Sequence, residues 1–230
     1  MFLPLNDFID HQYTLVSINL PHHGESYWNE NTAFSIEDAK HLVRQIMLEN
    51  KVEKLSLLGY SMGGRICLSI VEYMPEQIDN CLLIASDGLV FNPFYFFATH
   101  TVLGLFLLKR FVNHPDIYVR FIKWLRHKKW IDAARFKFVM NYINSIEERL
   151  FLFKVWPAMK LFIPDKKIID KTIRNYNIQL VIFSGNFDRI IPPQHAFKFK
   201  RLVPSSKLIN LDKGHRIFEK DTWKIISECL

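Results

Sequence analysis

The chain has 230 residues, a hydrophobic fraction of 49% and a charged fraction of 23%, which excludes an intrinsically disordered protein. Its length suits one α/β domain with an insertion better than two independent domains. The formal net charge of +7 and a pI of about 9.2 leave nucleic acid and an acidic membrane open as partners until the basic residues are located.

The N-terminal residues do not have the pattern of a signal peptide. Residues 1–12 (MFLPLNDFIDHQ) lack a basic segment ahead of an apolar one, and Asp7 and Asp10 interrupt their hydrophobicity. We therefore expect a cytoplasmic protein.

Strands and helices alternate in the first part of the chain and again near its end. Apolar runs bounded by turn residues predict strands, and apolar residues at helical spacing predict helices. The predicted strands cover residues 14–20, 54–60, 79–87, 179–185 and 206–212. The predicted helices cover residues 35–49, with Ser35 as the N-cap, 63–74, 193–202 and a segment from about 221. Strands that are apolar on both faces and joined by helices indicate an α/β fold, with a mostly parallel sheet flanked by helices.

Residues 89–175 interrupt this alternation, because they are aromatic, helical in pattern and without a convincing strand. We predict a helical cap insertion there, with the α/β core formed by residues 1–88 and 176–230. The basic stretch 109–137 lies within the cap. Such a stretch can contact phosphate or lipid headgroups, but it is more typical of the solvated side of helices. We therefore expect no nucleic-acid partner, and peripheral membrane attachment through the basic cap is a weaker alternative.

Residues 88–108 (GLVFNPFYFFATHTVLGLFLL) contain no charged Asp, Glu, Lys or Arg and are long enough to cross a membrane. Asn92-Pro93 predicts a turn that would leave too short a helix for this. We therefore favour a buried or lid segment over a membrane span.

Three cysteines, Cys67, Cys81 and Cys229, are widely spaced and lie among apolar neighbours. An odd number of such residues favours buried thiols in a reducing compartment over a disulfide framework. The chain has no CxxC and no Cys/His cluster, so we expect no metal site.

The sequence GYSMGG, residues 59–64, follows a predicted strand and precedes a predicted helix. It fits the G-x-S-x-G pattern of a sharp strand-to-helix turn, in which flanking glycines avoid clashes and the serine hydroxyl is exposed. A bare G-x-S-x-G occurs often by chance, so Ser61 needs further support as a nucleophile.

Serine is a poor nucleophile at neutral pH, so a catalytic serine needs a base that takes its proton and a carboxylate that orients the base. The sequence offers both. Asp188 follows the strand 179–185 in GNFDRIIP, and His215 follows the strand 206–212 in DKGH. The carboxyl ends of parallel strands meet at one edge of a sheet, and ligands bind there. The chain order Ser, Asp, His is the one expected with this nucleophile turn.

At this point the chain resembles the α/β-hydrolase family, in particular its capped branch of small esterases, carbon–carbon bond hydrolases and iminopeptidases. Four motifs occur in the family order over nearly the whole length: NLPHHGES, GYSMGG, GNFDRIIP and DKGH. The resemblance implies that Ser61 is the nucleophile, His215 the general base and acid, and Asp188 the residue that orients it. It also implies that no metal or cofactor is required.

The same resemblance suggests further site residues. The backbone N–H of Met62 would be one donor to the oxyanion, and Tyr60 and His23 would contact substrate. His22 stands where the family usually has glycine in Pro-Gly-His-Gly, and His23 is also compatible with a structural role in this loop.

Two alternatives to these residues remain open. Asp87 ends the strand after the nucleophile, and some relatives take the acid of the triad from that position. His195 lies near the start of a predicted helix and is more typical of a surface residue.

The chain also departs from the family. The second oxyanion donor normally comes from a His-Gly motif upstream of the Pro-Gly-His-Gly loop, and that loop already begins here at Pro21. The sheet is therefore expected to lack N-terminal strands. Either the natural chain begins upstream of Met1, or the strand 14–20 pairs directly with the strand 54–60.

The leading hypothesis is a serine hydrolase that cleaves a carboxylic ester or related acyl substrate. The aromatic cap, with residues such as Phe94, Phe106 and Trp124, favours a small apolar or aromatic acyl substrate. A non-catalytic α/β-hydrolase-fold remnant that binds a ligand or partner is the alternative. The sequence does not fix the oligomeric state.

Overall fold

The computed structural model describes residues 2–9, 13–29 and 32–230. The chain forms two compact units. Unit 1 comprises residues 1–18, 35–91 and 162–230, and unit 2 comprises residues 19–34 and 92–161.

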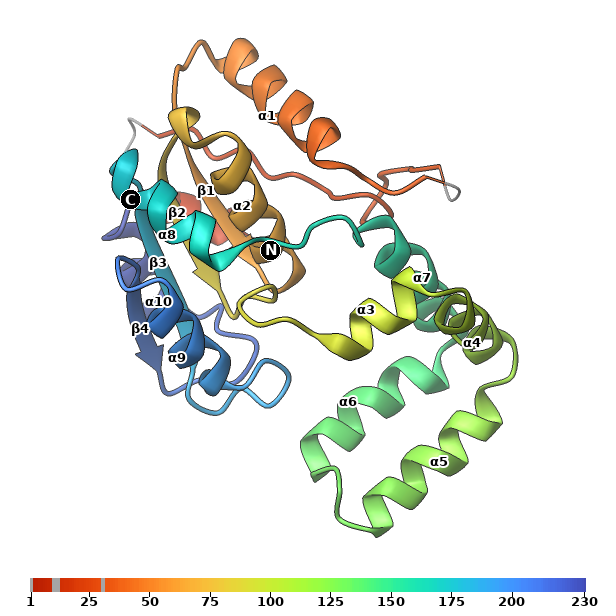
Figure 1. The fold of residues 1–230 in the computed structure, drawn as a ribbon. Coiled ribbons are helices and arrows are strands. Elements are labelled where there is room, and N and C mark those ends of the chain that lie inside the picture. The colour runs from red at the N-terminus through yellow and green to blue at the C-terminus, as the bar shows by residue number, and fades with distance from the viewer. Residues whose placement is uncertain (1, 10–12, 30–31) are drawn as a thin grey trace. The chain divides into compact units, whose positions relative to one another are not determined.

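Unit 1 contains a four-stranded parallel sheet with the strand order β1-β2-β3-β4 (Figure 1). The strands are β1 Leu55–Tyr60, β2 Ile78–Ile84, β3 Gln179–Gly185 and β4 Lys207–Leu211. Their register aligns the carboxyl ends, since Tyr60 pairs with Ile84, and Ile84 pairs with Phe183. The loops that follow the four strands therefore leave the sheet at the same edge.

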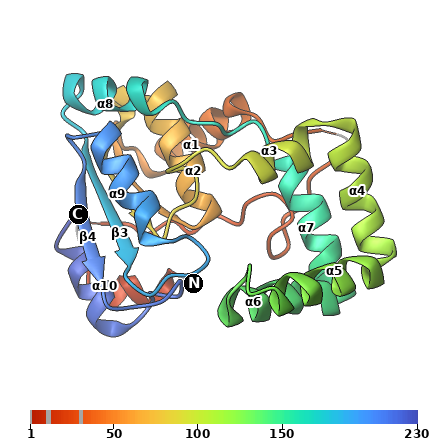
Figure 2. The ribbon, with the colours of Figure 1, turned by 60° about the horizontal axis from the view of Figure 1, so that its bottom comes forward.

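Helices cover both faces of this sheet (Figures 1 and 2). Unit 1 contains α1 Ile36–Asn50, α2 Met62–Tyr73, α8 Lys166–Asn175, α9 Pro193–Leu202 and α10 Lys220–Ser227, with the short 3-10 helices η1 Leu3–Asp7 and η2 Pro75–Gln77. On one face, α2 packs on β1 and β2, and α9 packs on β3 and β4. On the other face, α10 and η1 pack together over the sheet.

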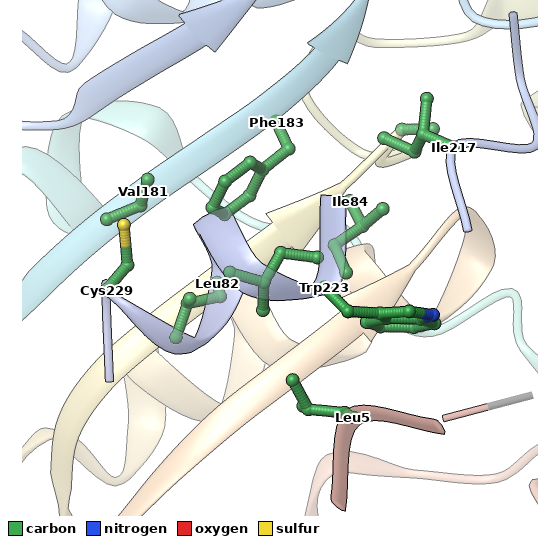
Figure 3. Close-up of a cluster of buried hydrophobic side chains, with 10 residues drawn as sticks. Leu5, Leu82, Ile84, Val181, Phe183, Ile217, Trp223 and Cys229 are labelled. Carbon is green, nitrogen blue, oxygen red and sulfur yellow. The ribbon is translucent and has the colours of Figure 1, made fainter. Parts of the chain in front are cut away.

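The core on the α10 face is built from alternate residues of the two central strands. Figure 3 shows Leu82 of β2 and Phe183 of β3 directed toward helix α10, which carries Trp223, with Leu5 of η1 on the other side of the Trp223 ring. All four side chains are buried. Alternation along a strand places every second side chain on this face, and the intervening ones face α2 and α9.

The N-terminus of α1 confirms the predicted cap. The Ser35 hydroxyl accepts a hydrogen bond from the N–H of Asp38, and the Asp38 carboxylate accepts one from the N–H of Ser35 at 2.8 Å. This reciprocal capping box satisfies two N–H groups that the helix leaves without partners.

The predicted strand over 14–20 is wrong. These residues have no regular secondary structure and are mostly exposed, and β1 pairs only with β2. The idea that this segment pairs directly with β1 is wrong for the same reason. An apolar, β-branched run becomes a strand only where a neighbour accepts its backbone hydrogen bonds, and residues 14–20 find no such neighbour among the described residues. The other predicted strands and helices are confirmed to within a few residues.

Unit 2 is helical within its described residues. It contains α3 Pro93–His100, α4 Val102–Asn113, α5 Pro115–His127, α6 Ala133–Asn144 and α7 Ile146–Ala158. The buried guanidinium of Arg149 on α7 donates to the carbonyl of Val112 at 3.1 Å and to the carbonyl of Ile143. One cation thereby satisfies the C-terminal carbonyls of two other helices, α4 and α6.

The apolar stretch 88–108 is divided between α3 and α4. Asn92 caps α3, with Pro93 as its first residue, and Thr101 caps α4. Among the described residues, no single helix is long and apolar enough to span a membrane, although α3 and α4, bent by 89°, pass that test as a pair.

The unit boundaries differ from the ranges expected for core and cap. Helix α8 lies inside the predicted cap range but belongs to unit 1, where it packs on α2. Residues 19–34, expected in the core, belong to unit 2, where the N–H of Phe34 donates to the carbonyl of Ala158 at 2.8 Å.

Candidate active site

Ser61 lies in a sharp turn between β1 and α2. Its φ of 49° and ψ of −118° are a strained conformation for a residue other than glycine. Backbone hydrogen bonds hold the turn: the N–H of Ser61 donates to the carbonyl of Ile84 at 3.0 Å, and the N–H of Asp87 donates to the carbonyl of Ser61 at 2.8 Å. The end of β2 therefore fixes the backbone on both sides of the serine.

The glycines of the motif differ in whether the structure has room for a side chain at their positions. A Cβ on Gly59 would lie 2.7 Å from the Cα of Gly64, and a Cβ on Gly64 would lie 2.6 Å from the Cβ of Ser86. Both positions exclude any side chain, because α2 packs close to the strands. A Cβ on Gly63 meets nothing within 4 Å. The prediction that both glycines of G-x-S-x-G prevent clashes is therefore confirmed for Gly59 and wrong for Gly63.

Asp188 and His215 are in direct contact. The Nδ1–H of His215 donates to Oδ2 of Asp188 at 2.8 Å, and the side chain of Asp188 is only 1% exposed. The other oxygen of Asp188 accepts from the N–H groups of Ile190 and Ile191 at 2.8 and 2.9 Å. Three donors satisfy the buried carboxylate, and with the proton on Nδ1 a neutral His215 carries its lone pair on Nε2.

Close packing between the loops after β3 and β4 makes this contact. The N–H of Phe187 donates to the carbonyl of Lys213 at 3.0 Å, and that of Asn186 donates to the carbonyl of Leu211 at 2.8 Å. A Cβ on Gly185 would lie 2.5 Å from the Lys213 carbonyl oxygen, so only glycine allows the two loops to approach so closely. Because β3 and β4 are neighbours, their loops bring together an aspartate and a histidine 27 residues apart.

Tyr60 joins the histidine to the serine turn. Its ring centroid lies 5.2 Å from that of His215, and its hydroxyl is within 3.4 Å of the His215 carbonyl, to which it donates. Phe218 packs edge-on against Tyr60 at 4.6 Å. Tyr60 immediately precedes Ser61, so His215 lies against the neighbour of the serine.

The structure does not bring Ser61 and His215 into a hydrogen bond. Within the described residues, neither the Ser61 hydroxyl nor the His215 ring is a hydrogen-bond partner of the other. In enzymes without substrate such bonds are often long and tighten only in the complex.

Met62 is the first residue of α2. The N–H groups in the first turn of a helix have no acceptor within the helix, and the helix dipole makes that end attractive to negative charge. The N–H of Met62 is therefore chemically suited to an oxyanion.

Asp87 has a different partner from the one that the alternative triad requires. Its Oδ2 accepts from the Arg65 guanidinium at 2.6 Å, and its Oδ1 accepts from the N–H of Gly88 at 2.7 Å. His215 is paired with Asp188 instead. Arg65 was missed by the sequence reasoning, although a lone arginine in the apolar helix MGGRICLSIVEY signals a need for a buried anion.

His23 lies in unit 2, in a tight loop formed by residues 20–26. Its Nδ1–H donates to the carbonyl of Pro21 at 3.0 Å, and its ring packs edge-on against Phe151 at 5.0 Å. These contacts belong to the loop and to α7, and a role in substrate binding stays a prediction. His195, the other histidine considered, lies in the first turn of α9 and is half-buried.

The three cysteines are free and buried, as predicted. Burial raises the pKa of the Cys67 thiol to about 12 and raises the pKa of Cys81 well above its ordinary value. Both thiols are therefore protonated at neutral pH and are poor nucleophiles. Among the described residues, no group of three or more His, Cys, Asp or Glu side chains is placed to hold a metal ion.

Comparisons with known proteins show the family and the fold of the chain. The model of the family described as the alpha/beta hydrolase fold matches residues 1–222, which confirms the resemblance noted from the motifs. The chain is 23% identical over 221 residues to the uncharacterized hydrolase YugF of Bacillus subtilis (strain 168). The aligned region covers 94% of this chain and 78% of that protein.

Solved structures show the same fold. MenH from S. aureus matches 92% of this chain and 80% of its own, with a TM-score of 0.60 and 19% identity. A thermophilic esterase from Thermogutta terrifontis matches 89% of this chain and 75% of its own, with a TM-score of 0.58 and 18% identity. At such identities the likeness shows the fold alone.

Proposed function

The chain belongs to the alpha/beta hydrolase fold family, and we propose that it is a serine hydrolase that cleaves a carboxylic ester or related acyl substrate through an acyl-enzyme on Ser61. The observation that carries the proposal is the hydrogen bond between the buried Asp188 and the half-buried His215, whose ring lies against Tyr60, the neighbour of Ser61. A serine becomes a nucleophile at neutral pH when an oriented imidazole can take its proton.

In the first half of the reaction, the Ser61 oxygen attacks the substrate carbonyl while Nε2 of His215 takes the hydroxyl proton. Asp188 keeps the proton of the neutral imidazole on Nδ1 and stabilises the imidazolium that forms. The carbonyl oxygen becomes negative in the tetrahedral intermediate, and the N–H of Met62 donates to it. The intermediate collapses when the bond to the leaving alcohol breaks and His215 returns its proton to that alcohol.

In the second half, water hydrolyses the acyl-enzyme by the same route. His215 takes a proton from the water as it attacks the acyl carbon, and it then protonates the Ser61 oxygen as that bond breaks. The acid leaves and the hydroxyl is restored. The residues of the chain supply every proton transfer in this cycle.

The composition of unit 2 supports an apolar or aromatic acyl group as substrate. Exposed aromatic side chains occur along α3: Phe94, Phe96 and Phe97. Pockets for acyl substrates are generally lined by apolar and aromatic side chains with a few polar groups.

A fluorophosphonate probe tests the proposal, because it forms a covalent bond only with an activated serine. We expect a single adduct at Ser61, located by mass spectrometry of the digested protein. The variant Ser61→Ala should not be labelled, whereas Ser69→Ala, which removes a buried hydroxyl from the same region, should be labelled like the native chain. Folded protein that carries no label on Ser61 would contradict the proposal.

One observation favours a second candidate, a non-catalytic protein that binds a ligand or partner. Strand β1, which ends just before Ser61, is at an edge of the described sheet, where a neighbouring strand and its loop would otherwise supply a second oxyanion donor. Losing one such donor typically costs about 3 to 4 kcal/mol in the barrier. Failure of both labelling and ester turnover in protein with native circular dichroism would favour this candidate.

A further inference from the structure

Helix α5 lies at the surface of unit 2. None of its residues is buried, and its inner side consists of half-buried residues at helical spacing: Tyr118, Ile122 and Leu125. Tyr118 attaches this side to α4, since its hydroxyl donates to the carbonyl of Leu107 at 2.8 Å and its ring packs edge-on against Phe111 at 5.1 Å. Helix α6 packs beside α5 (Figure 1).

A second stripe of α5 is apolar and exposed. Ile117, Phe121 and Trp124 are spaced by four and three residues, so they share one side of the helix, and they are 48%, 54% and 45% exposed. Each of them comes one position before a residue of the inner side, so the exposed stripe is distinct from the side that attaches α5 to its neighbours. A contiguous exposed apolar stripe of this kind marks an interaction surface.

The turn after α5 adds another aromatic ring to this stripe. Lys129 has a φ of 59°, and the N–H of Trp130 donates back to the carbonyl of Leu125 at 3.0 Å. This turn folds Trp130 onto Trp124, with ring centroids 5.5 Å apart, and leaves Trp130 70% exposed. Phe121 in turn stacks on Trp124 at 6.0 Å.

The same segment is strongly basic. Residues 117–130 contain five Lys and Arg and no Asp or Glu. Arg120 and Lys123 lie beside the apolar stripe, and Lys128 and Lys129 follow its last turn. Within the described residues, none of these four cations forms an ion pair with an acidic side chain. Their charge is therefore available to an external anion.

Helix α4 repeats this combination. Gly104, Leu108 and Val112 face inward, whereas Val102, Leu103 and Phe106 are exposed. Two exposed cations, Lys109 and Arg110, follow these apolar residues along the helix.

We propose that α4 and α5 form a docking surface for an anionic lipid membrane. An interfacial helix inserts apolar and aromatic side chains at the boundary between headgroups and acyl chains, and its Lys and Arg pair with lipid phosphates. Tryptophan favours this boundary because its ring is apolar and its N–H is polar. A nucleic acid would use the cations but would leave the apolar stripe in water, so the membrane fits both features. The inference does not depend on the activity of Ser61.

Sedimentation with vesicles tests this surface. The full chain should bind vesicles of equal parts phosphatidylglycerol and phosphatidylcholine, should bind pure phosphatidylcholine much more weakly, and should lose affinity between about 0.1 M and 0.5 M NaCl. Each cation near an anionic surface contributes about a fivefold gain in affinity. We therefore expect Lys123→Glu with Lys128→Glu to weaken binding at least about twentyfold, and Phe121→Ser with Trp124→Ser at least about tenfold.

Matched variants on α9 distinguish a defined surface from a general effect of net charge. Lys198→Glu with Arg201→Glu makes the same charge change, and Phe197→Ser with Leu202→Ser makes the same apolar change, on exposed positions of that helix. These should weaken binding less than about threefold. Circular dichroism verifies that each variant is folded. Equal losses of vesicle affinity from the α5 and α9 variants would overturn the proposal. Absence of vesicle binding by the native chain would also overturn it, whether or not the chain binds duplex DNA in a salt-sensitive way.

Discussion

Unit 1 and unit 2 contain the same kinds of large apolar side chains but bury them to different extents. Phe183 on β3 is 0% exposed, whereas Phe106 on α4 is 59% exposed. A central strand is paired along both edges and covered on both faces, so its side chains are enclosed by backbone as well as by neighbouring helices. A helix in a small bundle is held by one stripe of side chains, and the rest of its surface meets solvent.

This difference bears on where the chemistry can be held precisely. Ser61, Asp188 and His215 all follow strands of unit 1, and hydrogen bonds between loop backbones fix their positions. Unit 2 has exposed aromatic and basic side chains on its helices. Substitution of these side chains does not disturb a sheet. We therefore expect unit 1 to carry the reaction and unit 2 to carry recognition.

The largest expected effect is the loss of the carboxylate that orients His215. Asp188→Asn should lower kcat for ester hydrolysis about 10⁴-fold, because an amide does not hold the imidazole in the tautomer that can accept a proton from serine. By contrast, His23→Asn in unit 2 should raise KM with little change in kcat, as expected of a substrate contact. Steady-state kinetics with a chromogenic ester measures both.

Asp87→Asn is the control for that substitution, because it makes the same chemical change at a carboxylate paired with Arg65. It should leave kcat within about tenfold of the native value and lower the free energy of unfolding by about 1 to 3 kcal/mol. Comparable losses of kcat from both aspartate variants would remove the distinction between them.

The next effect concerns stability. Phe183→Ala should lower the free energy of unfolding by about 3 to 5 kcal/mol, because it opens a cavity in the enclosed core of unit 1. Phe106→Ala should change it by less than about 0.5 kcal/mol, since that ring is already in solvent. Urea unfolding followed by far-ultraviolet circular dichroism measures both variants. Alkylation of Cys67 and Cys81, which are buried in unit 1 and have raised pKa values in the folded protein, reports the unfolding of unit 1 by itself. Similar shifts from the two variants would contradict the contrast between the units.

The smallest effect separates the glycines of the serine turn. Gly64→Ala should lower the free energy of unfolding by about 1 to 3 kcal/mol, because its Cβ would overlap Ser86. Gly63→Ala should be neutral or stabilising by up to about 1 kcal/mol, because its Cβ meets open space and alanine favours the helix. Urea denaturation of both variants checks this order, and a Gly63→Ala variant less stable than Gly64→Ala would show that the turn is packed differently.

Much of the architecture could be predicted from local patterns. Ser35 marked the start of α1, and the apolar runs at β2 and β3 marked strands buried on both faces. The segment 14–20 failed as a strand because its apolar pattern carries no information about whether a partner strand exists. The prediction that Gly63 is sterically required was wrong because the motif does not show which of its glycines lies against neighbouring backbone.

The sequence by itself determined the order of the elements and indicated the candidate nucleophile and base, since helical and strand periodicity, turn residues and motif spacing are local properties. It left two aspartates, Asp188 and Asp87, as candidates for the acid. Only the tertiary structure decided the partners: it paired His215 with Asp188 and gave Asp87 to Arg65. Two aspartates that each follow a strand look alike in the sequence. They differ in the neighbour that the strand order brings to them, and that order is a long-range property of the folded chain.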